Sequence, residues 1–188
     1  FLFNTLNSIS TLVLLKQTER ANAMLARLSS FLRYTLANEP TAKVTLAQEV
    51  ETLKLYLEIE KMRFEDRLRP HFRIDPSTIG ARLPSLLLQP LIENAIKYAV
   101  SPQEEGARIS LTSQVIGGRL RVTVADTGPG LREQAEAGRV SDRLARRSGT
   151  TSTGVGLANI RDRLAQAYGE DHRFEIDNPP EGGFTVII

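Results

Sequence analysis

The spacing of the apolar residues changes near residue 67, and this change constrains the fold more than any other feature of the chain. Before it, apolar residues recur every three or four positions, over residues 1–38 and again over 45–64. After it, short alternating stretches follow one another with shorter helical patterns between them. Spacing by three and four is typical of helices, and alternation is typical of strands. We therefore predict an α+β chain with a helical region over 1–66, a linker near 67–70 and a layered α/β domain over 67–188.

The helical region is expected to form a long hairpin. Residues 1–38 read as one helix of roughly 57 Å, at about 1.5 Å per residue, which is too long for a small core to bury. A second helix begins near Thr45, because Thr45 and Gln48 have the spacing of a capping box. Both helices carry apolar seams in the manner of heptads. We expect the hairpin to pair with a second copy as a four-helix bundle.

The second region is expected to be a sandwich of one sheet and one helical layer. Pro84 suits a helix start, whereas Pro90 predicts either a kink or a restart of that helix. Residues 131–153 are rich in Arg, Ser, Thr, Gly and Ala, so we expect a lid there. The predicted strands are residues 71–74, 109–115, 119–125, 174–176 and 184–188.

Composition excludes several functions. The 24 basic and 22 acidic residues leave a net charge of +2, which gives nucleic-acid binding little support. The chain has no cysteine, and His71 and His172 lie far apart, so neither thiol chemistry nor a zinc site is predicted. There is no run of 18 apolar residues. We expect no membrane contact by these residues and a cytoplasmic setting.

Three polar segments indicate a nucleotide pocket. In the first, Asn94, Lys97 and Tyr98 share one face of a helix whose other face carries apolar residues. In the second, Asp126 ends an alternating strand and is followed by Gly128 and Gly130. The third, residues 153–159, opens a helix with a glycine pair, where free N–H groups favour phosphate. The order of the three segments is far more specific than any one of them.

These segments resemble the boxes of sensor histidine kinases, with an N box at 93–98 and glycine boxes at 126–130 and 152–156. Residues 1–7, 56–64 and 88–94 are similar to the LytS-type branch, and the resemblance spans nearly the whole chain. It implies a Bergerat-type ATP-binding domain, ATP with Mg²⁺, homodimers and a response regulator as partner. It also implies a phosphoacceptor histidine directly before Phe1 and a sensor region, often membrane-embedded, further upstream.

Each candidate residue has a chemical role to set beside a structural one. The Asn94 amide oxygen would complete a Mg²⁺ shell of water and phosphate oxygens, and Lys97 would reach the phosphates. Tyr98 would pack near the adenine. Asp126 would accept a hydrogen bond from the adenine amine, since a carboxylate only accepts. The structural alternative for Asn94, Lys97 and Tyr98 is that they are ordinary helix residues.

The remaining candidates concern glycines and a carboxylate. Gly128 and Gly130 allow the backbone to approach the nucleotide, although a turn alone would also explain them. Glu93 is a candidate general base, and an orienting role is the other interpretation. The phosphate-binding helix start is expected to comprise Thr153, Gly154, Gly156 and Leu157.

Two departures from the family pattern keep alternatives open. Ser152 stands where a glycine is usual, and Phe184 stands where a threonine is frequent. The first hypothesis is a histidine autokinase core that passes phosphate from ATP to histidine and on to an aspartate of the regulator. The second is a nucleotide-gated dimerisation module without phosphotransfer. The third is a related ATPase of the chaperone or mismatch-repair kind, which the long hairpin disfavours.

Overall fold

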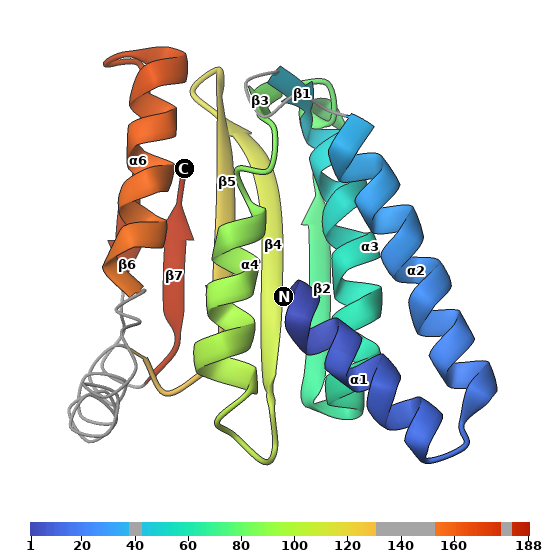
Figure 1. The fold of residues 1–188 in the computed structure, drawn as a ribbon. Coiled ribbons are helices and arrows are strands. Elements are labelled where there is room, and N and C mark those ends of the chain that lie inside the picture. The colour runs from blue at the N-terminus through green and yellow to red at the C-terminus, as the bar shows by residue number, and fades with distance from the viewer. Residues whose placement is uncertain (38–42, 131–152, 178–181) are drawn as a thin grey trace.

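The computed structural model describes residues 1–37, 43–130, 153–177 and 182–188. Figure 1 shows a sheet with helices packed against it and two further helices at the N-terminal side. The helices are α1 Leu2–Leu14, α2 Thr18–Ala37, α3 Leu46–Phe64, α4 Gln89–Ala95 and α6 Thr153–Tyr168. The strands are β1 Lys43–Thr45, β2 Leu68–Ile74, β3 Arg82–Pro84, β4 Ala107–Ile116, β5 Arg119–Asp126, β6 Glu175–Asp177 and β7 Phe184–Ile187.

The prediction of one helix over residues 1–38 is wrong. The helix breaks after Leu14, and α1 folds back beside α2 (Figure 1). Lys16 adopts a left-handed conformation, with φ of 58°. Its N–H donates to Val13 O, and the Gln17 N–H donates to Leu12 O at 2.8 Å. This pair of bonds is a Schellman motif, which satisfies the last carbonyls of α1 and ends the helix.

Helix α3 begins as predicted. The Thr45 hydroxyl accepts from the Gln48 N–H, and the Gln48 side chain accepts from the Thr45 N–H, which completes the capping box. The helix α2 packs antiparallel beside α3, so the hairpin is formed by α2 and α3. The expected end of the first helix, at residues 38–40, lies outside the described residues.

The expected linker at residues 67–70 is not a linker. A 3₁₀ turn, Glu65–Arg67, joins α3 directly to β2, which begins at Leu68. The Arg67 guanidinium donates to the carbonyl oxygens of Val100, Ser101 and Gln103. The helical region is therefore held against the α/β domain by hydrogen bonds and shares its core.

The sheet has five strands in the order β2-β4-β5-β7-β6. Strand β2 is parallel to β4, and the other neighbours are antiparallel. All five strands fall where alternation predicts them. A second sheet, formed by β1 and β3, was not predicted. Pro84 lies in β3 and does not start a helix, which corrects that expectation.

The core lies between the sheet and the helices. In β4 the burial alternates along the strand, so one face packs inward and the other faces solvent. Helices α4 and α6 cover the inner face (Figure 1). Their fully buried contributors include Ile92, Ile160 and Leu164. The predicted two-layer α/β sandwich is confirmed.

Candidate functional site

Helix α4 and the turn that follows it carry the first group of polar side chains. The helix begins at Gln89 with Pro90 in its first turn, so Pro90 starts the helix and does not kink it. After Ala95 the chain forms a π-helical turn, Ile96–Val100. The Ser101 N–H donates to Ile96 O at 2.9 Å, five residues back. Such turns are rare and occur often at functional sites.

The π turn changes how the predicted residues face. An α-helical spacing of Asn94, Lys97 and Tyr98 was expected, but the wider turn begins between them. Lys97 is exposed, whereas Asn94 and Tyr98 are half-buried. The Lys97 ammonium lies 4.7 Å from the centre of the Tyr98 ring, a cation–π contact. The expected core face is confirmed, with buried Leu87, Leu91, Ala95 and Ala99.

Glu93 lies beside Asn94 and is oriented by a neighbour one turn away. The Gln89 Nε2 donates to the Glu93 carboxylate at 2.8 Å. The Gln89 Oε1 is buried and has no hydrogen-bond partner among the described residues. A buried, unpaired amide oxygen is unusual and marks a place where a polar group can still be accommodated.

Asp126 occupies the exit of β5, as predicted. It is 9% exposed, and its carboxylate accepts from the Gly128 N–H at 2.9 Å. Burial raises the pKa of Asp126 to about 6, and hydrogen bonds from the Gly128 and Phe184 N–H groups offset part of that rise. At pH 7 and above the carboxylate is therefore mostly ionised, yet held in a poorly solvated place.

Gly128 brings the exit of β5 against the π turn. A Cβ at Gly128 would lie 2.4 Å from the Ala99 Cβ and 2.7 Å from the Ala99 Cα, so no side chain fits. Gly183 is equally constrained, since its Cβ would lie 2.8 Å from Asp126 O. Gly130 has a φ of 74°, which favours glycine. The sequence indicated Gly128 and Gly130, but the small residue Ala99 and Gly183 gave no separate functional signal.

The start of α6 lies beside Asn94. A Cβ built on Gly156 would lie 3.6 Å from the Asn94 Nδ2, which joins the first and third sequence segments. Leu157 is half-buried and packs on the core. Helix α6 does begin at Thr153, as predicted. The side chain of Thr153 and the surroundings of Gly154 lie outside the described residues, as do Ser152 and the rest of the expected lid at 131–153.

Three elements therefore meet at one place: the α4–π segment, the exit of β5 and the start of α6. They present an acceptor in Asp126, an amide in Asn94 and a cation in Lys97. The described residues contain no cluster of three His, Cys, Asp or Glu side chains that could hold a metal alone. Asn94 still fits a hard cation such as Mg²⁺, which usually takes few protein ligands and keeps water and phosphate oxygens.

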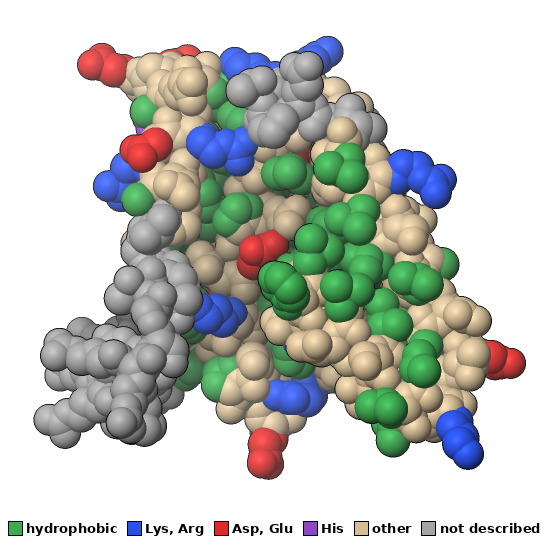
Figure 2. Space-filling model, in the orientation of Figure 1, with side chains coloured by type: hydrophobic (Ala, Val, Ile, Leu, Met, Phe, Trp, Pro, Cys, Tyr) green, Lys and Arg blue, Asp and Glu red, His purple; other side chains and the backbone are tan. Residues whose placement is uncertain are grey.

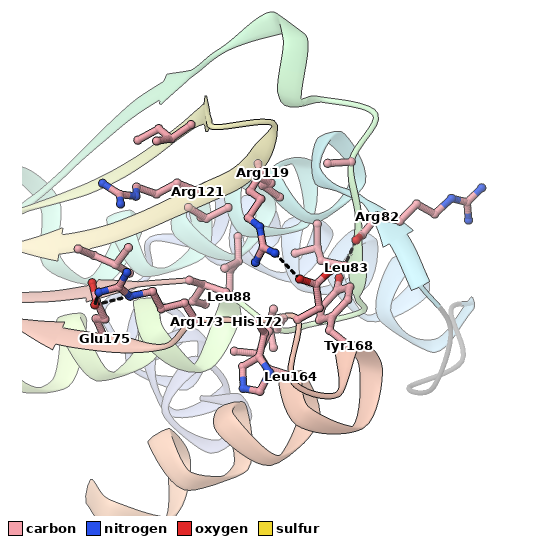
Figure 3. Close-up of a pocket in the computed structure, with 18 residues that line it drawn as sticks. Arg82, Leu83, Leu88, Arg119, Arg121, Leu164, Tyr168, His172, Arg173 and Glu175 are labelled. Carbon is pink, nitrogen blue, oxygen red and sulfur yellow. Dashed lines mark hydrogen bonds and ion pairs between the residues drawn. The ribbon is translucent and has the colours of Figure 1, made fainter.

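A cavity of about 560 Å³ lies at the opposite end of the domain. It is lined by the start of β5, the end of α6 and β3 (Figure 3). The site above lies at the end of β5 and the start of α6. The Arg119 guanidinium pairs with Asp171 at 2.6 Å across its mouth. His172 lines this cavity and His71 is exposed on β2, so neither histidine belongs to the polar site.

Two family models match the chain. Residues 1–68 match the histidine kinase model. Residues 81–188, more than half of the chain, match the model of histidine kinase-, DNA gyrase B- and HSP90-like ATPases. The boundary between the two matches falls close to the change in apolar spacing.

Known proteins agree with these matches. The sensor histidine kinase YesM of Bacillus subtilis is 33% identical over the whole chain, which covers 30% of YesM. The sensor protein LytS of Enterococcus faecalis is 31% identical over the whole chain, which covers 31% of LytS. The nucleotide-free catalytic domain of histidine kinase ThkA shares the fold, with a TM-score of 0.52 at 19% identity over 78% of this chain and 94% of ThkA's. The chain spans about a third of the length of the curated relatives.

Proposed function

Since this chain belongs to the histidine kinase-, DNA gyrase B- and HSP90-like ATPases, and within them to the sensor histidine kinases, we propose that it is the ATP-binding catalytic core of a two-component sensor. The observation that carries the proposal is the meeting of Asp126, Asn94 and Gly156 at one site. These residues come from three separate elements, and their chemistry matches the two ends of ATP.

The adenine end is Asp126. A buried carboxylate that already accepts from the Gly128 N–H has a further lone pair for the adenine amine, and it offers no donor to a guanine carbonyl. Gly128 lets the exit of β5 pack directly on Ala99 of the π turn, because any side chain there would collide with Ala99. Tyr98, which is half-buried on the π turn, supplies an aromatic surface for the base.

The phosphate end is formed by the start of α6 together with Asn94 and Lys97. The free N–H groups at the start of this 16-residue helix attract phosphate, and Gly156, which has no side chain, leaves room for it beside Asn94. Lys97 adds a flexible positive charge. Bound Mg²⁺, held by the Asn94 amide oxygen, would neutralise phosphate charge.

Phosphoryl transfer then requires an acceptor histidine and a base. A bond forms between the γ-phosphorus and a histidine ring nitrogen, the bond to the β-phosphate oxygen breaks, and ADP leaves. Glu93, oriented by Gln89, takes the proton that the imidazole nitrogen releases. The phosphoryl group passes next to an aspartate of a response regulator. Such transfer depends mainly on positioning and charge neutralisation, which these residues provide.

The N-terminal helices would join two copies. Figure 2 shows apolar side chains gathered over α1 and α2, on the right of the view. On these two helices the exposed large apolar residues are Leu2, Phe3, Leu6, Val13, Leu14, Leu25 and Leu36. A large apolar patch that is exposed on a protein surface marks an interaction site. We assign it to a second copy of the chain, in keeping with the bundle that the apolar seams predict.

We place these residues in the cytoplasm, as part of a longer protein whose other regions sense the signal. None of the helices in the described part of the chain has the length and apolar character that a bilayer crossing requires.

A phosphorylation assay tests the proposal. The chain, extended so that a histidine precedes Phe1, is incubated with ATP labelled at the γ-phosphate. We expect label that is stable to base and labile to acid, as a phosphorus–nitrogen bond is. The same extended chain with glutamine in place of that histidine is the matched control, and Asn94→Ala should lose the label.

The outcomes separate the three hypotheses. Label on the histidine supports the kinase. ATP binding without label, in a chain that dimerises, would favour the nucleotide-gated module. Steady release of free phosphate without labelled protein would favour a related ATPase.

A further inference from the structure

The loop that leads into α4, residues 85–88, is held by side chains from two other helices. Leu86 adopts a left-handed conformation, with φ of 56°, which is strained for a residue with a branched side chain. Leu87 and Leu88 are almost completely buried. Such a conformation persists only where its surroundings fix it. The loop therefore needs specific contacts, and the structure shows them.

The first contact comes from α3. The Glu49 carboxylate accepts from the Leu86 N–H at 2.9 Å and from the Leu88 N–H at 2.8 Å. Glu49 is 2% exposed, and this burial raises the pKa of its carboxyl above the ordinary value. Leu88 is the residue directly before the first residue of α4. Glu49 thus fixes the chain where α4 begins.

The second contact comes from α6. The Arg163 guanidinium donates to Leu86 O at 3.0 Å and also to Ser85 O. The opposite charges of Arg163 and Glu49 attract across the loop. Both sides of the Leu86 peptide backbone are therefore bound, the N–H by α3 and the carbonyl by α6. The same helix α6 carries Gly156, which lies beside Asn94.

We propose that Glu49 and Arg163 are positioning residues that clamp the loop 85–88 and thereby set the place of Asn94 on α4 relative to Gly156 on α6. This inference rests on the proposed function, because it assigns the clamp to the phosphate end of the ATP site. Neither side chain has to touch the nucleotide.

The geometry gives the clamp a consequence for regulation. Helix α3 belongs to the helical hairpin, and α6 belongs to the nucleotide site. A displacement of α3 along its axis would pull on the Leu86 and Leu88 N–H groups while Arg163 holds the carbonyl side. Motion of the hairpin would then change the approach of α4 to α6, and with it the affinity for the phosphates.

The two ends of the site make the clamp testable. Asp126 is fixed by β5, so binding of the adenine should depend on the loop less than binding of the phosphates does, although Tyr98 follows α4 on the π turn. Binding of the phosphates should depend on it, because Asn94 and Gly156 lie on the two elements that the clamp aligns. The ratio of the affinities for ATP and adenosine therefore reports positioning, whereas a general loss of stability would lower both affinities alike.

The experiment measures both affinities by calorimetry for the wild type, Glu49→Gln and Arg163→Gln. In Glu49→Gln, the side-chain amide nitrogen must face the N–H of either Leu86 or Leu88, and that N–H then has no acceptor. We expect the ATP-to-adenosine ratio to fall about tenfold in each variant, since a lost hydrogen bond to a buried charge is worth a factor of ten or more. Hydrogen exchange of the Leu86 and Leu88 amides should become faster in Glu49→Gln.

The controls lie on the same helices. Glu51 on α3 pairs with Lys54 at an exposed position, and Arg161 on α6 is also exposed. Glu51→Gln and Arg161→Gln should leave the ratio unchanged. Arg163→Lys keeps the charge, so it should recover part of the loss.

Two results would overturn the clamp, and they have different consequences for the proposed function. If the wild type prefers ATP over adenosine and both variants keep the wild-type ratio, the clamp is wrong and the proposed function stands. If the wild type binds neither ligand, the proposed function fails and the clamp fails with it.

Discussion

At the scale of single residues, the buried position of Asp126 serves the proposed function but lowers the stability of the fold. Its carboxylate is buried at the end of β5, and its pKa is raised from 3.8 to about 6 by that burial. The folded chain therefore holds the proton more tightly than the unfolded chain. Ionised Asp126 lowers the stability of the fold, and the cost appears as the pH rises from about 4 to above 6.

Asp126→Asn should stabilise the chain in the absence of nucleotide. The amide oxygen keeps an acceptor for the Gly128 N–H, and removal of the buried charge outweighs the weakening of the hydrogen bond from the Phe184 N–H. At pH 8 we expect the free energy of unfolding to rise by about 1 to 3 kcal/mol, at about 1.4 kcal/mol per pKa unit. Urea unfolding at pH 8 and pH 4 measures this, and the difference should disappear at pH 4. A variant less stable than the wild type at pH 8 would contradict the account.

Gly128→Ala should damage the same site for a steric reason. The added Cβ would lie 2.4 Å from the Ala99 Cβ. We expect unfolding to become easier by about 1 to 3 kcal/mol, the usual cost of overpacking. Gly80→Ala is the control, because nothing lies within 4 Å of its Cβ. Combining Ala99→Gly with Gly128→Ala should restore part of the lost stability. If no stability is recovered, the steric strain arises at a contact other than the one with Ala99.

At the scale of elements, α3 carries two buried carboxylates, and one of them links the helical region to the nucleotide domain. Glu49 binds the loop before α4, and Glu60 pairs with Arg63 one turn further along the same helix. The Glu60 side chain is 2% exposed, and both of its oxygens accept from the Arg63 Nη1, at 2.7 and 2.8 Å. A buried charge of this kind depends on its partner.

Arg63→Ala should therefore cost far more than the loss of an exposed ion pair. It leaves the Glu60 carboxylate buried without its partner, which corresponds to about 3 to 5 kcal/mol. Lys54→Ala breaks the exposed Glu51–Lys54 pair on the same helix and should cost about 1 kcal/mol or less. Urea unfolding of both variants at pH 7 compares them. Equal losses would show that Glu60 finds another partner or becomes protonated.

The sequence predicts these elements to different degrees. Alternation identified all five strands of the main sheet, and the capping box located the start of α3. The break after α1 was missed because Lys16 takes the left-handed position where glycine is usual. The π turn was missed because local sequence does not distinguish it from an α-helix. Glu49 carried an overlooked signal, since it lies three residues after Leu46 and four before Leu53, on the buried face.

The site was predictable to the extent that it is local. The motifs indicated Asn94, Asp126 and Gly156, and the structure brings Asn94 to the start of α6. The contact of Gly128 with Ala99, and the clamp on residues 85–88, are tertiary contacts between segments far apart in the chain. No local spacing reports such contacts.

At the scale of the whole molecule, the apolar surface on α1 and α2 contrasts with the polar site on the other side of α4. Phe3 is 84% exposed and Leu14 is 80% exposed, both on α1. Such side chains are costly to leave in water over a broad patch. A second copy covering them would leave the nucleotide site accessible.

Replacing Phe3 and Leu14 together by glutamate should make the chain monomeric. Analytical ultracentrifugation should show a dimer for the wild type and a monomer for the double variant. ATP affinity should stay the same, because neither residue lies at the site. Val115→Glu, at an exposed position on β4, is the control and should leave the dimer intact. A monomeric wild type at tens of micromolar would refute the assignment of the patch.

Calorimetric titration of ATP, with and without Mg²⁺, into the wild type and Asn94→Ala tests whether Asp126, Asn94 and Gly156 form an ATP site. We expect the wild type to bind ATP more tightly with Mg²⁺, and Asn94→Ala to lose this dependence while still binding the nucleotide through Asp126. A wild type that binds no adenine nucleotide would contradict the account, because the three elements that meet at Asp126, Asn94 and Gly156 would then form no ATP site.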